Sequence, residues 1–274
     1  MSKARLDGLL LRIPCDRRML VAELGHLGSM SLAPAPVVRS DTHPLHCELW
    51  RVSDGSVQLG RIDQHDLSER VGLVWGPAVG AWWSTLSRAF AAAVGTYCEL
   101  MLTVPGVVVT DVEPARVYSL VLGMIADNPM ARWADAALGF GYRKYRGSFI
   151  VDGAGGWTVS SSDRRRLMSV VSRSSSQFEP TVDLARIDAA LQYPLLGIRR
   201  DGGFVRSWLR RSLFQPGLSV RPIAASLDVV DGLFGGLLPG RLDIPPYAAG
   251  GDGALEFSNL EAAVSYPSPV EGVA

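Results

Sequence analysis

Several stretches of the chain alternate apolar and polar residues, a pattern that predicts β-strands with one buried face. The clearest cover residues 45–52, 97–104 and 116–125. Because Asp-Gly favours chain reversal and proline breaks a strand ladder, we expect the first strand to end at Ser53-Asp-Gly-Ser and the second at Pro105-Gly106. The second and third would then be consecutive long strands of one sheet.

One segment between these strands has helical spacing instead. Within residues 81–93, Trp82, Leu86 and Phe90 recur every four residues, which predicts an amphipathic helix. Such an aromatic stripe either packs on a core or covers a substrate.

Two shorter helices are predicted further along the chain. The first covers residues 127–138, with Asp127 or Asn128 as its N-cap, Pro129 in its first turn and Gly139 at its end. The second covers residues 183–191.

The remaining apolar runs predict more strands. Residues 147–160 resemble a hairpin around Asp152-Gly153, and residues 194–205, 206–212 and 254–266 each suit a strand. The fold class that follows is α+β, with mostly antiparallel strands and a few peripheral helices.

Length and charge then narrow the classes of function. The 274 residues contain no internal repeat or clear linker, so we expect one domain over residues 1–274. The 27 basic and 27 acidic residues cancel, which argues against nucleic acid or an anionic membrane as partner.

Cysteine usage and hydropathy indicate a soluble cytoplasmic protein. Cys15, Cys47 and Cys98 are far apart, so they indicate neither a disulfide framework nor a zinc site. The apolar run Gly8–Arg12 is too short for a signal peptide, and the most hydrophobic window, Val117–Ile125, is too short to cross a bilayer.

The common cofactor and hydrolase motifs do not occur. The sequence has no GxGxxG after a strand, no GxxxxGK[ST], no HExxH and no GxSxG. His43 and His46 lie three residues apart, and in a strand they would point to opposite faces, which makes a poor metal site. We expect neither a metal nor a cofactor.

Lysine is rare in this chain, and that makes one lysine a candidate nucleophile. The two lysines are Lys3, near an N-terminus that we expect to be frayed, and Lys144 in Gly141-Tyr-Arg-Lys-Tyr-Arg-Gly147. An amine attacks carbonyl groups only when neutral, a state favoured by burial or by a neighbouring cation such as Arg143. The alternative is a surface lysine in an arginine-biased sequence.

Two carboxylates could share a pocket with this amine. Glu48 and Glu99 each lie between apolar residues of a predicted strand, and His46, Glu48 and Trp50 would share one face. A buried glutamate needs a partner, and beside a neutral lysine it would form an acid/base pair. The alternative is that both glutamates face water.

Three blocks of the sequence resemble the acetoacetate decarboxylase family. They are Leu45-His-Cys-Glu-Leu-Trp50, Gly95-Thr-Tyr-Cys-Glu99 before Thr103-Val-Pro105, and Asp127-Asn-Pro followed by Gly139-Phe-Gly-Tyr-Arg-Lys144. They occur in the family's order within a resemblance that runs from about residue 10 to about residue 270. The resemblance implies the family's β-barrel-like sheet and a homo-oligomer.

The resemblance also implies roles for residues of these blocks. By that correspondence Lys144 is the Schiff-base lysine, and Glu99 and Glu48 are the pocket carboxylates. We expect substrate contacts from neighbouring aromatic and cationic side chains, namely Tyr97, Tyr142, Arg143, Trp50, Trp82 and Trp83.

The chain departs from the family at informative positions. In acetoacetate decarboxylase, the standard example of this effect, a second lysine beside the nucleophile lowers its pKa. Here Tyr145 stands at that position and Arg143 replaces the usual proline. A family arginine that handles the substrate carboxylate falls at Pro14, near Arg12, and residues 56–94 form a helical insertion.

These observations together predict a small-molecule enzyme of specialised metabolism. Lys144 would form a Schiff base with a keto acid or polyketide-like substrate and catalyse decarboxylation, or aldol addition and dehydration. The alternatives are a non-covalent, pericyclase-like cyclase that uses the barrel as a shaped apolar cavity, and a ligand-binding protein without turnover.

Overall fold

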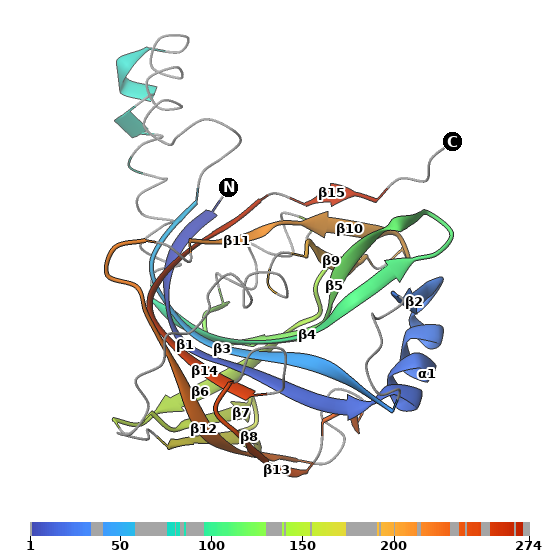
Figure 1. Cartoon of the computed structure of the whole chain (residues 1–274). Coiled ribbons are helices and arrows are strands. Elements are labelled where there is room, and N and C mark those ends of the chain that lie inside the picture. Colours follow the sequence, from blue (N-terminus) through green and yellow to red (C-terminus); the bar gives the residue numbers. More distant parts are fainter. Residues whose placement is uncertain are drawn as a thin grey trace.

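The fold is taken from a computed structural model of the chain (Figure 1). The residues it describes are 2–33, 41–57, 76–79, 81–82, 85, 96–129, 139, 141–153, 155–173, 191, 193–199, 201–212, 215–230, 236–238, 240–247, 253–265 and 267–270.

Strands dominate this part of the chain. In chain order the elements are β1 (Ser2–Asp16), α1 (Arg17–Leu27), β2 (Met30–Leu32), β3 (Thr42–Val57), β4 (Tyr97–Val109), β5 (Glu113–Ala126), β6 (Lys144–Val151), β7 (Trp157–Ser161), β8 (Arg166–Arg173), β9 (Leu195–Ile198), β10 (Phe204–Ser207), β11 (Leu209–Arg211), β12 (Ser219–Val229), β13 (Arg241–Ile244), β14 (Gly253–Val264) and β15 (Ser268–Pro269).

The strands form one strongly curved sheet that closes on itself. Following the pairings, β5, β6, β7, β8, β12, β14, β1, β3 and β4 form a ring, because β4 also pairs with β5. All pairs are antiparallel except β5 with β6 and β5 with β9. The predicted class of mostly antiparallel strands with few helices is confirmed.

Five neighbouring strands of the ring have both faces covered. We call β14, β1, β3, β4 and β5 the shared wall, because they border the ring on one side while β9, β10, β11 and β15 curl over their other side (Figure 1). The face toward the ring carries the main core. Its fully buried members include Leu9, Leu11, Ile13, Leu45, Leu49, Leu100, Leu102, Tyr118 and Leu120.

The opposite face of the shared wall, called here the site face, carries a second apolar cluster together with buried polar groups. Leu10, Trp50, Leu255 and Phe257 pack there, and Glu48 is only 2% exposed. Because β1 and β3 alternate, Leu9 and Leu11 point into the main core while Leu10 points to the site face.

Helix α1 closes one end of the ring and begins at a defined cap. The Asp16 carboxylate accepts hydrogen bonds from the backbone N–H groups of Arg18, at 2.7 Å, and Met19, at 3.2 Å. Leu20 and Leu24 then bury the inner side of the helix.

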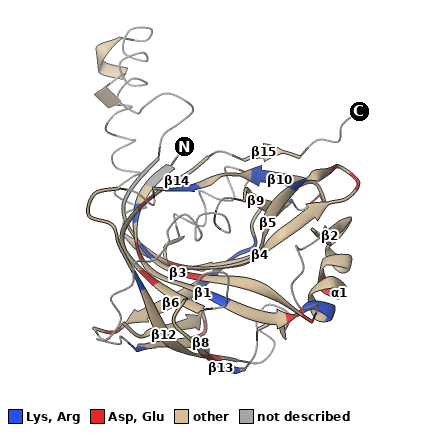
Figure 2. Cartoon of the chain, in the orientation of Figure 1, with Lys and Arg blue, Asp and Glu red and all other residues tan. Residues whose placement is uncertain are grey.

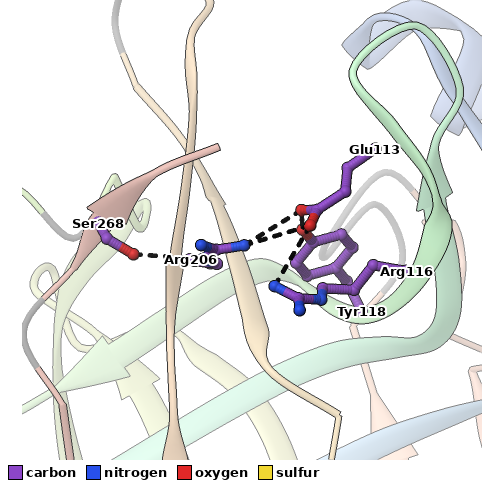
Figure 3. Close-up of polar contacts among 5 residues, drawn as sticks. All are labelled: Glu113, Arg116, Tyr118, Arg206 and Ser268. Carbon is purple, nitrogen blue, oxygen red and sulfur yellow. Dashed lines mark hydrogen bonds and ion pairs between the residues drawn. The ribbon is translucent and has the colours of Figure 1, made fainter. Parts of the chain in front are cut away.

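A polar network ties the curled-over strands to β5 (Figure 3). Arg206 of β10 donates to Glu113 at 3.2 Å and to the Ser268 hydroxyl of β15 at 3.3 Å. Arg116 lies 3.3 Å from the same carboxylate, and the Tyr118 hydroxyl donates to it. Burial first, and then this hydrogen bond, raise the pKa of Tyr118 to about 12, so the phenol remains a donor.

Most of the predicted strands are confirmed, namely those over residues 45–52, 97–104, 116–125, 147–160 and 254–266. The strand predicted over residues 194–205 is divided by a turn into β9 and the start of β10, and the one over 206–212 contains the end of β10 and β11. Elsewhere on the chain, seven elements were not predicted, namely β1, α1, β2, β8, β12, β13 and β15. The prediction of a frayed N-terminus was wrong, because β1 pairs along its length with β3 and β14.

Two predicted strand ends were also wrong. Asp54-Gly55 lies inside β3, which continues to Val57 opposite β1. At Pro105-Gly106 the ladder with β5 shifts register, and Gly106 adopts a φ of +81°. β4 therefore passes through a bulge, not a turn, because the missing proline donor falls where the pairing is interrupted.

The predicted helices lie largely outside the described residues. Where the structure describes them, residues 77–79, 81–82, 85, 129 and 191 are helical. Among the described residues, no helix is both long and apolar enough to cross a membrane.

Candidate active site

The strand register places the candidate residues in two adjacent rows on the site face. In the first row, Leu10 of β1 lies opposite Glu48 of β3, Glu48 opposite Met101 of β4, Met101 opposite Met124 of β5, and Met124 opposite Lys144 of β6. Directly opposite side chains point to the same face of a sheet. Long-range strand pairing therefore brings Glu48 and Lys144 to one surface.

The second row holds the partner of the lysine. Glu99 lies opposite Trp50, and its carboxylate Oε2 is 2.7 Å from Lys144 Nζ. The two side chains are 12% and 6% exposed, so water screens the pair little. The ammonium also lies 6.0 Å from the centre of the Tyr97 ring. The amine is thus enclosed beside one acid and one aromatic ring.

Glu48 belongs to a different buried pair. Arg211 of β11 donates to Glu48 Oε2 at 2.5 Å, and Trp50 Nε1 donates to the same oxygen at 2.9 Å. Arg211 also donates to the Leu191 carbonyl at 3.2 Å. Because the arginine and glutamate side chains are 4% and 2% exposed, Arg211 balances the charge of Glu48 within the protein interior.

Gly8 allows close strand packing beside the pair of Glu48 and Arg211. Gly8 lies opposite both Trp50 and Phe257, and the two rings approach to 5.6 Å with a tilt of 55°. A Cβ at residue 8 would lie 1.9 Å from the Leu49 carbonyl oxygen. Glycine therefore permits the close strand approach that brings the two rings together.

A buried histidine lies among these charged groups. Arg12 lies opposite His46 on the site face, and burial followed by the charges of Arg12 and Arg211 lowers the pKa of His46 to about 3. His46 is therefore neutral near pH 7. The cationic side chains of Arg12, Arg211 and Lys144 and the carboxylates of Glu48 and Glu99 thus belong to the same face of the sheet.

An apolar cluster adjoins the lysine. Met101, Val121, Met124 and Leu195 are buried together, and Tyr142 packs against them while its hydroxyl shares a hydrogen bond with Ser207 Oγ. Lys144 thus lies between a charged region and an apolar one.

One predicted contact residue, Arg143, lies apart from the lysine. Arg143 and Tyr145 line a separate cavity that Lys144 does not line, consistent with alternation along an extended segment. Trp82 is 60% exposed. Trp83 lies outside the described residues.

Sequence reasoning missed Arg211 as a site residue. The arginine-bearing stretch 206–212 predicted a strand, and alternation does separate Leu209 and Arg211 from Arg210. Its position opposite Ala262 of β14 is what points it at Glu48, and that pairing leaves no local signal in the sequence.

Comparison with known proteins supports the fold. No protein-family model matches the chain, and no curated protein matches it in sequence. Solved structures do match. Acetoacetate decarboxylase from Legionella pneumophila subsp. pneumophila has a TM-score of 0.58 at 10% identity, with 100% of this chain and 88% of that chain covered.

Two further structures give the same result. A second acetoacetate decarboxylase has a TM-score of 0.56 at 12% identity, covering 99% of this chain and 90% of that chain. The enduracididine biosynthesis enzyme MppR complexed with pyruvate has a TM-score of 0.53 at 11% identity, covering 100% and 91%. At these identities the likeness establishes the fold.

Proposed function

We propose that this chain, which has the fold of acetoacetate decarboxylase, is a lysine-dependent enzyme of specialised metabolism acting on a keto acid or polyketide-like substrate. The observation that carries the proposal is the buried contact of 2.7 Å between Lys144 Nζ and Glu99 Oε2. An enclosed amine beside one carboxylate has both the nucleophile and the proton acceptor that imine formation needs.

The first half of the proposed reaction joins substrate and enzyme. Glu99 takes a proton from the Lys144 ammonium, and the neutral amine attacks the substrate ketone carbon to give a carbinolamine. The protonated Glu99 returns the proton to the carbinolamine hydroxyl, which leaves as water. The product is an iminium whose positive nitrogen can accept an electron pair from the adjacent carbon.

The second half depends on the bond that breaks next to the iminium. Loss of carbon dioxide from a β-keto acid leaves an enamine, which is protonated at carbon and hydrolysed to free the lysine. Loss of a C–H proton to Glu99 also gives an enamine, which can add to an aldehyde and then lose water. Hydrolysis of the iminium completes either course.

Two features support a carboxylate-bearing substrate. Three cationic side chains, Arg12, Arg211 and Lys144, belong to the site face, and charge-assisted hydrogen bonds to carboxylates are the strong ones. In addition, one structure of the similarly folded MppR holds the condensation product of pyruvate and imidazole 4-carboxaldehyde. A 2-oxo acid or a β-keto acid fits both features.

Borohydride trapping tests the proposal. The full-length protein is incubated with acetoacetate or pyruvate, reduced, and measured by intact mass and peptide mapping. We expect an adduct at Lys144 whose mass is that of the ketone less one oxygen, and an acetone adduct from acetoacetate if carbon dioxide is lost first.

The chain offers two matched controls for this experiment. Lys144→Arg keeps a cation beside Glu99 without a nucleophilic amine, so it should fold and give no adduct. Lys3→Arg removes the other lysine and should give the full adduct. An adduct that survives in Lys144→Arg would contradict the proposal. Turnover without any adduct, retained in Lys144→Arg, would favour the non-covalent cyclase instead.

A further inference from the structure

A cavity lies behind the lysine-bearing strand, away from Glu99. It has a volume of about 520 Å³ and is bordered by α1, β5, the segment 141–146, the end of β7, β8 and β9. Small-molecule sites typically fall between about 300 and 1,000 Å³. Neither Lys144 nor any other residue of the candidate active site described above, apart from Val121 of the adjoining apolar cluster, lines it.

The polar side of this cavity is cationic. Arg143 and Arg146 line it with the hydroxyl-bearing Ser161 and Ser162, whereas Glu23 is its one lining carboxylate. Among the described residues, no carboxylate forms an ion pair with Arg143 or Arg146. Two guanidinium groups and one carboxylate therefore line the same cavity, so its charged lining residues are net cationic. Figure 2 shows that elsewhere the charged positions are scattered as short segments along mostly uncharged strands.

The opposite side of the cavity is apolar. Its wall consists of Leu27, Val121, Leu122, Ile125, Leu167, Ile198 and Leu237. Leu27, Leu122, Leu167 and Ile198 are only partly buried and pack on the edge of the main core. Water in such a cavity would contact apolar side chains on one side and guanidinium groups on the other.

From this juxtaposition we propose a second binding site, for an amphiphilic anion. The ligand class is a carboxylate or phosphate monoester with a short apolar chain. Its head accepts hydrogen bonds from Arg143 and Arg146, and its chain replaces water against the leucine and isoleucine wall. Guanidinium groups are the preferred partners of both kinds of anion.

The proposed site is separate from the imine chemistry but touches the same strand. Arg143 and Tyr145, which line the cavity, flank Lys144 in sequence. The Arg143 carbonyl also accepts a hydrogen bond of 2.9 Å from the Met124 N–H, beside the first row of site residues. The site would exist whether or not Lys144 forms a Schiff base.

Calorimetric titration of the full-length protein tests this proposal. The probes are octyl phosphate, octanoate and the uncharged octyl glucoside, all below their micelle concentrations. We expect saturable one-site binding of at least one anion and none of octyl glucoside. The double variant R143Q/R146Q should weaken anion binding about 10-fold or more, because it removes two charge-assisted hydrogen bonds.

Two further variants make the result specific to this cavity. R173Q/R210Q removes two exposed charges that do not line the cavity and should leave the affinity within about twofold of the unmodified protein, because exposed charges away from the site are screened. Ser162→Trp places a bulky side chain at the exposed rim and should reduce binding. Absence of anion binding, equal binding of octyl glucoside, or unchanged affinity in R143Q/R146Q would each overturn the proposal.

Discussion

Replacing Arg211 by methionine should destabilise the protein far more than replacing an ordinary surface arginine. Arg211 is 4% exposed and its guanidinium neutralises Glu48, which is 2% exposed. In Arg211→Met, Glu48 keeps only the hydrogen bond of 2.9 Å from Trp50. The variant therefore contains a buried carboxylate without a cation.

The expected magnitude follows from this burial. Breaking a buried ion pair by removing one partner typically costs about 3–5 kcal/mol, because the remaining charge is desolvated and unpaired. The double variant Glu48→Gln/Arg211→Met has no uncompensated charge and keeps a Trp50 acceptor at position 48. We expect its free energy of unfolding to lie within about 2 kcal/mol of the unmodified protein, so the coupling energy exceeds about 2 kcal/mol.

Urea unfolding followed by tryptophan fluorescence measures these free energies, with the single variant Glu48→Gln completing the cycle. Arg173→Met serves as the control, since Arg173 is exposed at the end of β8 and should change stability by less than about 0.5 kcal/mol. The reasoning from a buried pair would be refuted by either of two results. Arg211→Met could lose no more unfolding free energy than this control, or the losses in Arg211→Met and Glu48→Gln could simply add in the double variant.

Three smaller predictions follow from other contacts. Because His46 has a pKa lowered to about 3 in the folded protein, its native form binds fewer protons than the unfolded chain below pH 6.5. Between pH 6.5 and pH 5, the free energy of unfolding of the unmodified protein should therefore fall by about 2 kcal/mol more than that of His46→Gln. Urea unfolding at both pH values measures this difference, and an equal fall in the two proteins would contradict the assignment. In Gly8→Ala, the new Cβ would lie 1.9 Å from the Leu49 carbonyl oxygen. We expect this variant to lower the free energy of unfolding by about 2 kcal/mol or more. An unchanged value would show that β1 and β3 can separate at no cost. Glu113→Gln weakens the network around Arg206, whose side chain is 29% exposed, so we expect a loss of only about 1 kcal/mol and faster amide exchange in β10 and β15; unchanged exchange would mean that the network does not hold these strands.

The long strands could be predicted from sequence because their alternation is local. In β3 the spacing correctly separates Cys47 and Leu49, which face the main core, from Glu48 and Trp50 on the site face, whereas consecutive residues of β4 are buried because both faces of the shared wall are covered. The errors came from turn signals. Asp54-Gly55 favours reversal in isolation, yet pairing with β1 carries β3 past it, which is a tertiary effect that no local rule contains.

The site residues also differ in whether the local sequence could identify them. Lys144 and Glu99 were identifiable because lysine is rare and because the resemblance supplied the motif, and the structure brings them to 2.7 Å. Arg211 was not identifiable. Its role depends on β11 lying opposite Ala262 of β14, across the site face from Glu48, and such a long-range register leaves no trace in the residues around Arg211.

The register also bears on the departure at position 145, where Tyr145 replaces the family's second lysine. Tyr145 is 52% exposed and lines the cavity behind β6, whereas Lys144 points to the site face, so in this chain a cation at position 145 would lie on the far side of the strand from Glu99. The positive charges that do share the site face are Arg12 and Arg211, whose effect reaches His46. Arg12 and Arg211 therefore place cationic side chains on the same face of the sheet as Lys144, although position 145 carries no cation.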